Sequence, residues 1–114
     1  MERFVSVYRG NEQLFEKVKL AGSFRSRLRG LMFYREMPAI DGLLLYPCNS
    51  AHMFWMRFSL DLIYLSQAGV VIDIQTLVPN KVGPLKKSAY YILETEAGIG
   101  REKNIQIGDC FWWK

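Results

Sequence analysis

Short runs of apolar residues, separated by turn-forming residues, extend along most of the chain. Eight runs have the length and the β-branched or aromatic content of strands: Phe4 to Tyr8, Leu14 to Leu20, Gly42 to Leu45, Ala51 to Arg57, Leu60 to Leu65, Val70 to Val78, Ala89 to Glu96 and Ile105 to Trp113. Gly10-Asn11 predicts a turn that joins the first two runs into a hairpin. About eight closely spaced strands favour a mainly β fold, an antiparallel sandwich or a small barrel.

One segment departs from this pattern and predicts a short helix near residues 23–34. Its apolar residues share one helical face, at positions i, i+4, i+7 and i+8: Phe24, Leu28, Leu31 and Met32. Ser23 is a natural N-cap, and Pro38 disfavours helical backbone at the residue before it. We expect the apolar face of this helix to pack on the sheet.

Two connections carry strong turn signals. Gln67-Ala68-Gly69 predicts a tight hairpin loop. Pro79-Asn80 and Gly83-Pro84 frame a longer loop, which is basic because it carries Lys81, Lys86 and Lys87.

Composition predicts one soluble domain over residues 1–114. Half of the residues are apolar and 23% are charged, which suits a single hydrophobic core. No apolar run approaches the roughly 20 residues of a membrane span, and no signal-peptide stretch follows Met1-Glu2-Arg3. We therefore expect a cytoplasmic protein without a membrane span, in which Cys48 and Cys110 are unlinked thiols.

The net charge of +4 originates in the first third of the chain. Residues 1–40 hold eight Lys/Arg and four Asp/Glu, whereas residues 41–114 hold seven of each. Arg25 and Arg29 fall on one flank of the predicted helix and are candidate anion contacts, while Arg27 falls on the opposite flank. Because the basic cluster is divided in this way, the sequence does not favour nucleic-acid binding.

The middle of the chain carries candidate polar chemistry. We expect a turn at Phe58-Ser59 to bring Arg57 and Asp61 into a hydrogen-bonded pair. Glu94 follows an apolar run, where a buried acid needs an arginine partner such as Arg57. Together with His52, these residues form the candidate polar site.

Metal and nucleophilic chemistry are not favoured by the spacing of the residues that would perform them. His52 is the single histidine, and the chain has no HxH, HExxH or CxxC motif, so we expect neither a metal nor a cofactor. Cys48 and His52 would lie about 13 Å apart along an extended strand, too far for a nucleophile and its base. Asp61, Glu94 and Asp109 could share acid and base roles if the sheet brought them together. The alternative is that they are structural.

Several short motifs together resemble a known family, the uncharacterised bacterial and archaeal domain-of-unknown-function family 192. They span about residues 22–112 and occur in this order: Arg29-Gly30-Leu31-Met32, Gly42-Leu43-Leu44, Pro47-Cys48, Ser50, His52, Phe54-Trp55-Met56-Arg57-Phe58, Leu60-Asp61, Leu93-Glu94, Ala97-Gly98 and Gly108-Asp109. Ser66 stands where family members tend to have an aspartate. The resemblance implies a compact, jelly-roll-like β fold with a short helix, and it implies no activity.

We interpret the chain as a non-catalytic, β-rich binding or interaction domain for a protein or a small molecule. The alternative is a small enzyme or an anion-binding protein that uses His52, Arg57, Asp61 and Glu94. An open pocket around these side chains would indicate ligand chemistry, whereas burial and mutual hydrogen bonding would indicate a structural role.

Overall fold

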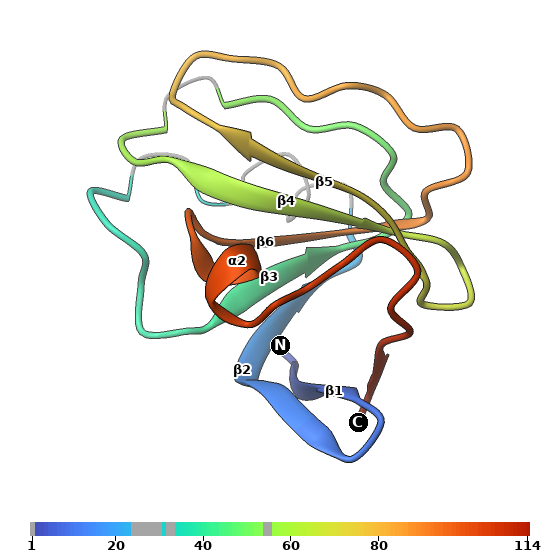
Figure 1. The fold of residues 1–114 in the computed structure, drawn as a ribbon. Helices are drawn as coiled ribbons and strands as arrows, with labels where there is room; N and C mark the ends of the chain where they lie inside the picture. Colours follow the sequence, from blue (N-terminus) through green and yellow to red (C-terminus); the bar gives the residue numbers. More distant parts are fainter. Residues whose placement is uncertain (1, 24–30, 32–33, 54–55) are drawn as a thin grey trace.

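The computed structural model of the protein describes residues 2–23, 31, 34–53 and 56–114. Its elements follow in the order β1 (Phe4–Arg9), β2 (Glu12–Ala21), β3 (Gly42–Leu45), β4 (Leu60–Leu65), β5 (Val71–Leu77), β6 (Tyr91–Glu96), α2 (Ile99–Glu102) and β7 (Trp112–Trp113). The strands form one sheet with the order β5-β4-β6-β3-β2-β1-β7 (Figure 1). The predicted mainly β class is confirmed, with seven strands in the described residues. The helix predicted near residues 23–34 falls largely outside them.

The predicted N-terminal hairpin is present as β1 and β2. The strands are antiparallel, and their register shifts around Ser6, whose hydroxyl donates to the carbonyl of Glu16 at 2.7 Å. Opposite this irregularity, the backbone N–H groups of Glu16 and Lys17 both donate to Oδ2 of Asp41 at 2.9 Å. Asp41 therefore fixes the start of β3 against β2.

One pair of neighbouring strands is parallel, so the sheet is mixed, whereas the sequence predicted an antiparallel sandwich or a small barrel. β2 runs parallel to β3, with Val18 opposite Gly42 and Ala21 opposite Leu45. A parallel pair needs a crossover connection of about a dozen residues or more, and residues 22–41 are enough to supply it. The other neighbouring pairs are antiparallel.

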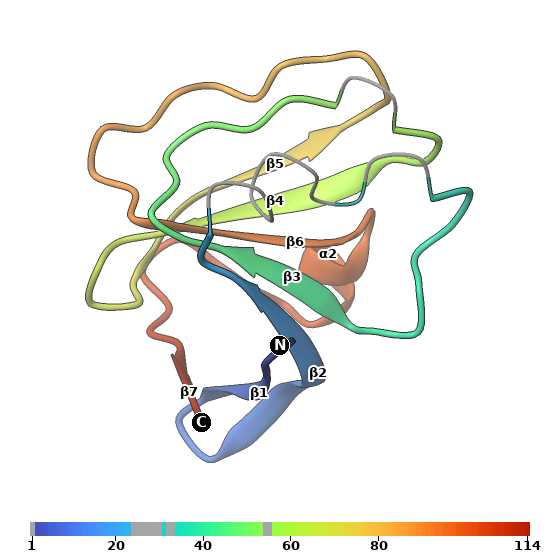
Figure 2. The same ribbon diagram turned by 180° about the vertical axis from the view of Figure 1, so that it is seen from behind.

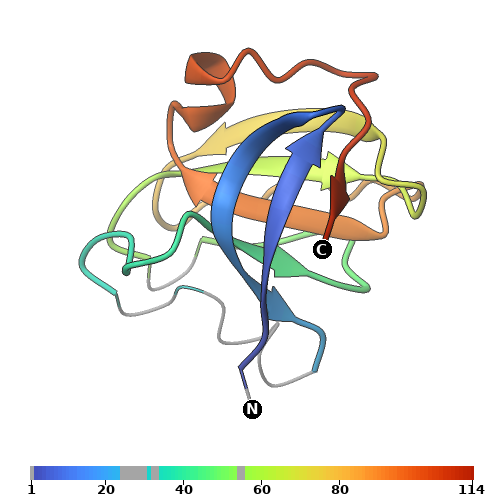
Figure 3. The same ribbon diagram turned by 90° about the horizontal axis from the view of Figure 1, so that it is seen from below.

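The C-terminal segment links the two edges of the sheet. β7 pairs with β1, while the N–H of Phe111 donates to the carbonyl of Gly69 and that of Val71 to Asp109, both at 2.8 Å. The sheet therefore curls toward a barrel without closing into one, as the view from below shows, with the β1–β2 hairpin lying in front of the central strands (Figure 3). Of the strand predicted over residues 105–113, only Trp112–Trp113 belongs to the sheet.

The curled sheet buries apolar side chains on both faces. The concave face carries an inner core that includes Val7, Phe15, Ile63 and Leu93. The convex face carries an outer core that includes Leu43, Leu62, Tyr64 and Ile92. Because successive strand residues alternate between the two, the central strands β4 and β6 are almost entirely buried.

Two irregular segments, residues 47–53 and 78–90, run side by side over the outer core (Figure 2). Backbone N–H groups of Met53, Gly83 and Lys86 donate to the carbonyls of Lys81, Ala51 and Asn49 at 2.6, 2.7 and 2.9 Å. The prediction of a strand over residues 51–57 was wrong for the described residues of this range. They form only one isolated β-bridge, between His52 and Val82. Met53 and Met56 are both buried, so the apolar side chains cover the sheet instead of alternating within it.

The short helix α2 was not predicted. It has four residues, too few for a periodic apolar signal, and it follows Gly98 in the left-handed region at a φ of 96°.

In the described residues, no helix is long and apolar enough to cross a membrane.

Candidate functional site

The structure does not bring the four residues of the candidate polar site to one place. Asp61 lies opposite Thr95 and Leu62 lies opposite Glu94 in the pairing of β4 with β6. Asp61 and Glu94 therefore point to opposite faces of the sheet. His52 lies half-buried in the segment over the outer core, and Arg57 is exposed before β4.

Asp61 is buried and its carboxylate is fully engaged by other parts of the fold. Oδ1 accepts a hydrogen bond from the Thr76 hydroxyl at 2.6 Å, and Oδ2 accepts from the N–H groups of Gly98 and Gly100 at 3.1 and 2.9 Å. A Cβ at Gly100 would lie 3.2 Å from Oδ2, so the close approach favours glycine there. The predicted Arg57–Asp61 pair was wrong, because α2 and β5 provide the donors instead.

Glu94 is buried in the outer core with only 5% of its surface exposed. Its cross-strand neighbours on that face are Leu43 and Leu62. Burial raises the pKa of Glu94 from 4.5 to about 7. Within the described part of the chain, no hydrogen bond or ion pair reaches its carboxyl group. The prediction that Arg57 pairs with Glu94 was therefore wrong, and Arg57 is exposed.

The remaining candidates from the sequence are two arginines and two cysteines. Arg25 and Arg29 lie outside the described residues. Cys48 and Cys110 are not linked by a disulfide, as predicted. Among the described residues, no group of three or more His, Cys, Asp or Glu side chains is placed to hold a metal ion.

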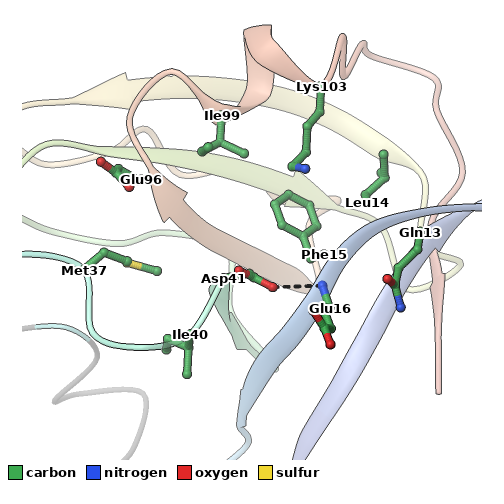
Figure 4. A pocket seen from close by; sticks show the side chains of 10 residues that line it. All are labelled: Gln13, Leu14, Phe15, Glu16, Met37, Ile40, Asp41, Glu96, Ile99 and Lys103. Atoms are coloured by element: carbon green, nitrogen blue, oxygen red, sulfur yellow. Dashed lines mark hydrogen bonds between the residues drawn. The ribbon is translucent and has the colours of Figure 1, made fainter.

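A cavity of about 350 Å³ lies at the end of the sheet where β2, β6, α2 and the segment before β3 meet (Figure 4). Its apolar lining comes from Leu14, Phe15, Met37, Ile40 and Ile99. Its polar lining comes from Gln13, Glu16, Asp41, Glu96 and Lys103. Sequence reasoning missed this site because the contributing residues come from four separate segments, each with an ordinary strand or turn pattern.

Charged groups of both signs border the cavity. The ammonium of Lys103 lies 5.4 Å from the centre of the Phe15 ring, on the α2 side of the cavity (Figure 4). Within the described residues, no carboxylate lies within 4.0 Å of this ammonium, and no ion pair uses Glu16 or Glu96. Asp41 uses Oδ2 for the amides of β2. The cavity thus combines an apolar interior with charged groups at its border. Among the described residues, its acidic groups and its one basic group form no ion pairs with one another.

The sheet order, the two cores and the cavity define a small mixed-β domain with a cavity at one end of its sheet. Comparison with known sequences shows that the chain belongs to the DUF192 family (Uncharacterized ACR, COG1430), whose model matches residues 5–113. The resemblance found in the sequence motifs is thereby confirmed.

Archaeal relatives in the family are UPF0127 proteins. One from Pyrococcus furiosus is 31% identical over 114 residues, with 96% of each chain covered. One from Thermococcus kodakarensis is 34% identical over 85% of this chain, and the match spans 64% of that relative's length. The match to a relative from Thermococcus sibiricus, which is also 34% identical, spans 66% of that relative's length.

Two solved structures share the fold. A protein of unknown function from Novosphingobium aromaticivorans superimposes with a TM-score of 0.83 at 23% identity, over 98% of this chain and 85% of that one. A proposed transcription regulator from Sinorhizobium meliloti 1021 superimposes with a TM-score of 0.80 at 22% identity, over 99% and 94%. At these identities the likeness concerns the fold alone.

Proposed function

We propose that this protein is a non-catalytic binding domain and that the cavity between β2, β6 and α2 binds a small zwitterionic molecule with an apolar body. The observation that carries the proposal is the composition of the cavity wall, apolar inside and charged with both signs at its border. Small-molecule sites are typically concave, about 300–1,000 Å³ in volume, mostly apolar and supplied with a few polar groups that orient the ligand.

The apolar part of the site supports binding of an aliphatic or aromatic group. Phe15 is buried in the inner core, so its ring is held in place, and Ile99 faces it from α2. Met37 and Ile40 close the opposite side (Figure 4). Burial of a ligand's apolar body against these four side chains supplies the non-directional part of the binding free energy.

The charged part supports binding of both an anionic and a cationic group. Lys103 lies over Phe15 and can bind a ligand carboxylate, while Glu96 and Asp41 can bind an ammonium. With three carboxylates and one ammonium, the border is net acidic, so a simple anion is disfavoured. An apolar amino acid is the smallest common molecule that has both charges and an apolar body.

A thermal-shift comparison tests this proposal with three probes of similar shape. L-leucine carries both charges, isoamylamine lacks the carboxylate and 4-methylpentanoate lacks the ammonium. Binding to the native state raises the melting temperature. We expect a concentration-dependent rise with L-leucine or L-phenylalanine that exceeds the rise with either singly charged analogue.

Two pairs of variants assign the effect to the cavity. Lys103→Gln and Glu96→Gln should each weaken the L-leucine shift. Arg101→Gln and Glu102→Gln change neighbouring exposed charges outside the cavity lining and should leave it intact. Equal shifts for all four variants, or equal shifts for the three probes, would show that the cavity is not a zwitterion site.

We also propose that the protein works in a reducing, cytoplasmic compartment. The support is that neither Cys48 nor Cys110 forms a disulfide, since disulfides form and persist in oxidising compartments. Fractionation of cells that produce the full chain tests this location.

A further inference from the structure

A second surface, independent of the cavity, lies on the loop over the outer core. Residues 74–93 contain no Asp or Glu, and neither do residues 42–60, which include the segment that pairs with this loop. The same two stretches contain Arg57, Lys81, Lys86 and Lys87. The loop side of the molecule therefore has a local excess of positive charge.

Aliphatic side chains project from the same loop. Val78, Val82 and Leu85 are 51%, 61% and 57% exposed. They account for three of the seven large hydrophobic side chains that are exposed among the described residues. Lys81 and Lys87, both exposed, flank Val82 and Leu85 in the sequence. We call residues 78–87 the basic loop.

The basic loop is held firmly against the protein from beneath. Gly83 is buried, and a Cβ there would lie 2.7 Å from the Tyr64 hydroxyl and 3.2 Å from the carbonyl oxygen of Ala51. The same hydroxyl donates to the carbonyl of Pro84 at 2.8 Å. Lys86 pairs with Asp73 at 3.2 Å. With its centre anchored in this way, the loop presents Val82 and Leu85 outward at little cost in conformational entropy on binding.

We propose that the basic loop docks on an anionic lipid bilayer, with Val82 and Leu85 inserted among the headgroups and Lys81 and Lys87 bound to lipid phosphates. In the described residues, no carboxylate lies within 4.0 Å of either of these two ammonium groups, so both are available. Interfacial binding scales with the buried apolar area and with attraction to anionic lipid, and the loop supplies both.

The chemistry of the loop favours a lipid surface over nucleic acid. Single-stranded nucleic acid is bound by aromatic stacking combined with a basic groove, whereas the exposed apolar residues of this loop are aliphatic. The loop also lies on the side of the molecule opposite the chain termini, as Figures 1 and 2 show, where it can approach a flat surface.

Vesicle co-sedimentation of the full chain tests this inference. The vesicles are phosphatidylcholine alone, or phosphatidylcholine mixed with an equal part of phosphatidylglycerol, each at low and at physiological salt. We expect binding to the anionic vesicles, weakened by salt, and little binding to phosphatidylcholine alone. The double variant Val82→Ser/Leu85→Ser should lower the partition coefficient by roughly tenfold or more, and Lys81→Gln/Lys87→Gln by roughly tenfold.

Matched controls separate the loop from general surface effects. Ile107→Ser removes an aliphatic side chain that is 68% exposed at another site, and Arg101→Gln removes an exposed charge near α2. Both should bind vesicles like the unchanged protein, and circular dichroism checks that every variant folds. Absence of binding to anionic vesicles would overturn the inference. So would equal binding by loop and control variants, or a preference for labelled single-stranded RNA that depends on the same lysines.

Discussion

Arg9 and Asp109 lie one hundred residues apart in the chain and form an ion pair with 2.9 Å between Nη1 and Oδ2. Arg9 also donates to the carbonyls of Asn104 and Lys103 at 3.0 and 3.1 Å and to Glu12 at 2.9 Å. Hydrogen bonds to Glu12 and Asp109 raise the pKa of Arg9. This one side chain thus ties the end of β1 to the segment between α2 and β7.

Replacing Arg9 by alanine should lower the free energy of unfolding by about 1–3 kcal/mol, because several charge-assisted hydrogen bonds are lost at once. Arg9→Lys should recover only part of the loss, since an ammonium cannot reproduce the forked geometry of the guanidinium. Urea unfolding measures both. Glu12→Gln is the control, because its exposed ion pair should contribute less than about 1 kcal/mol. A loss as large in Glu12→Gln as in Arg9→Ala would contradict this account.

Asp61→Asn should destabilise the protein by about 1–3 kcal/mol, because a neutral amide replaces the charged carboxylate that accepts three hydrogen bonds in a buried position. Thr76→Val removes the 2.6 Å hydrogen bond from the other side. A double-mutant cycle of Asp61→Asn and Thr76→Val, measured by chemical denaturation, should give a coupling free energy of about 1 kcal/mol or more. Additive losses would show that the two groups do not act on each other.

Glu94 should make stability fall with rising pH. Its pKa is raised by burial to about 7 in the folded protein and returns to about 4.5 on unfolding. Between pH 4.5 and 7 the folded state therefore binds more protons than the unfolded state. The contribution of Glu94 to the free energy of unfolding is complete below pH 4.5 and is lost as the pH rises through 7. The loss amounts to about 3 kcal/mol at 1.36 kcal/mol per pKa unit.

Glu94→Gln removes this titration and keeps the shape of the side chain. Thermal unfolding across pH 4–9 should show a flatter profile for the variant and higher stability than the unchanged protein above pH 7. Glu102→Gln, at an exposed position, serves as the control. If Glu94→Gln keeps the slope of the unchanged protein, Glu94 is not the group that titrates.

Gly69→Ala should destabilise the fold more than Gly10→Ala. Both glycines have positive φ, 86° and 59°, so each substitution carries a backbone cost of about 1–2 kcal/mol. A Cβ at Gly69 would additionally overlap the carbonyl oxygen of Phe111, whereas nothing lies within 4 Å at Gly10. The difference between the variants, measured by thermal unfolding, should be about 1–3 kcal/mol. Equal losses would argue against tight packing of the C-terminal segment on this turn.

The strands could be predicted because alternation and turn chemistry are local properties of the sequence. The structure contains the predicted hairpin at Gly10-Asn11 and the predicted strand from Leu60 to Leu65, with bounds close or equal to the predicted ones. Gln67-Ala68-Gly69 also forms the predicted tight turn, in which Gly69 donates its N–H to the carbonyl of Ser66 at 2.9 Å.

The polar contacts could not be predicted, because they depend on which strands become neighbours. Asp61 and Arg57 are close in sequence, yet the donors to Asp61 come from Thr76, Gly98 and Gly100. Side chains alternate between the two faces along each strand, but this places Asp61 and Glu94 on opposite faces only once the register of β4 with β6 is known. The cavity likewise exists only because residues from four segments meet.

The pairing of β7 with β1 also governs when the fold can be completed during synthesis. The N–H of Ser6 donates to the carbonyl of Lys114 at 3.0 Å, and that of Lys114 donates to Ser6 at 3.2 Å. β1 and β2 can form a hairpin early, but the other edge of β1 waits for residues made more than one hundred positions later. Contacts this distant in sequence slow folding. A nascent chain therefore keeps an open strand edge at β1 until residues 112–114 have been synthesised and have left the ribosome.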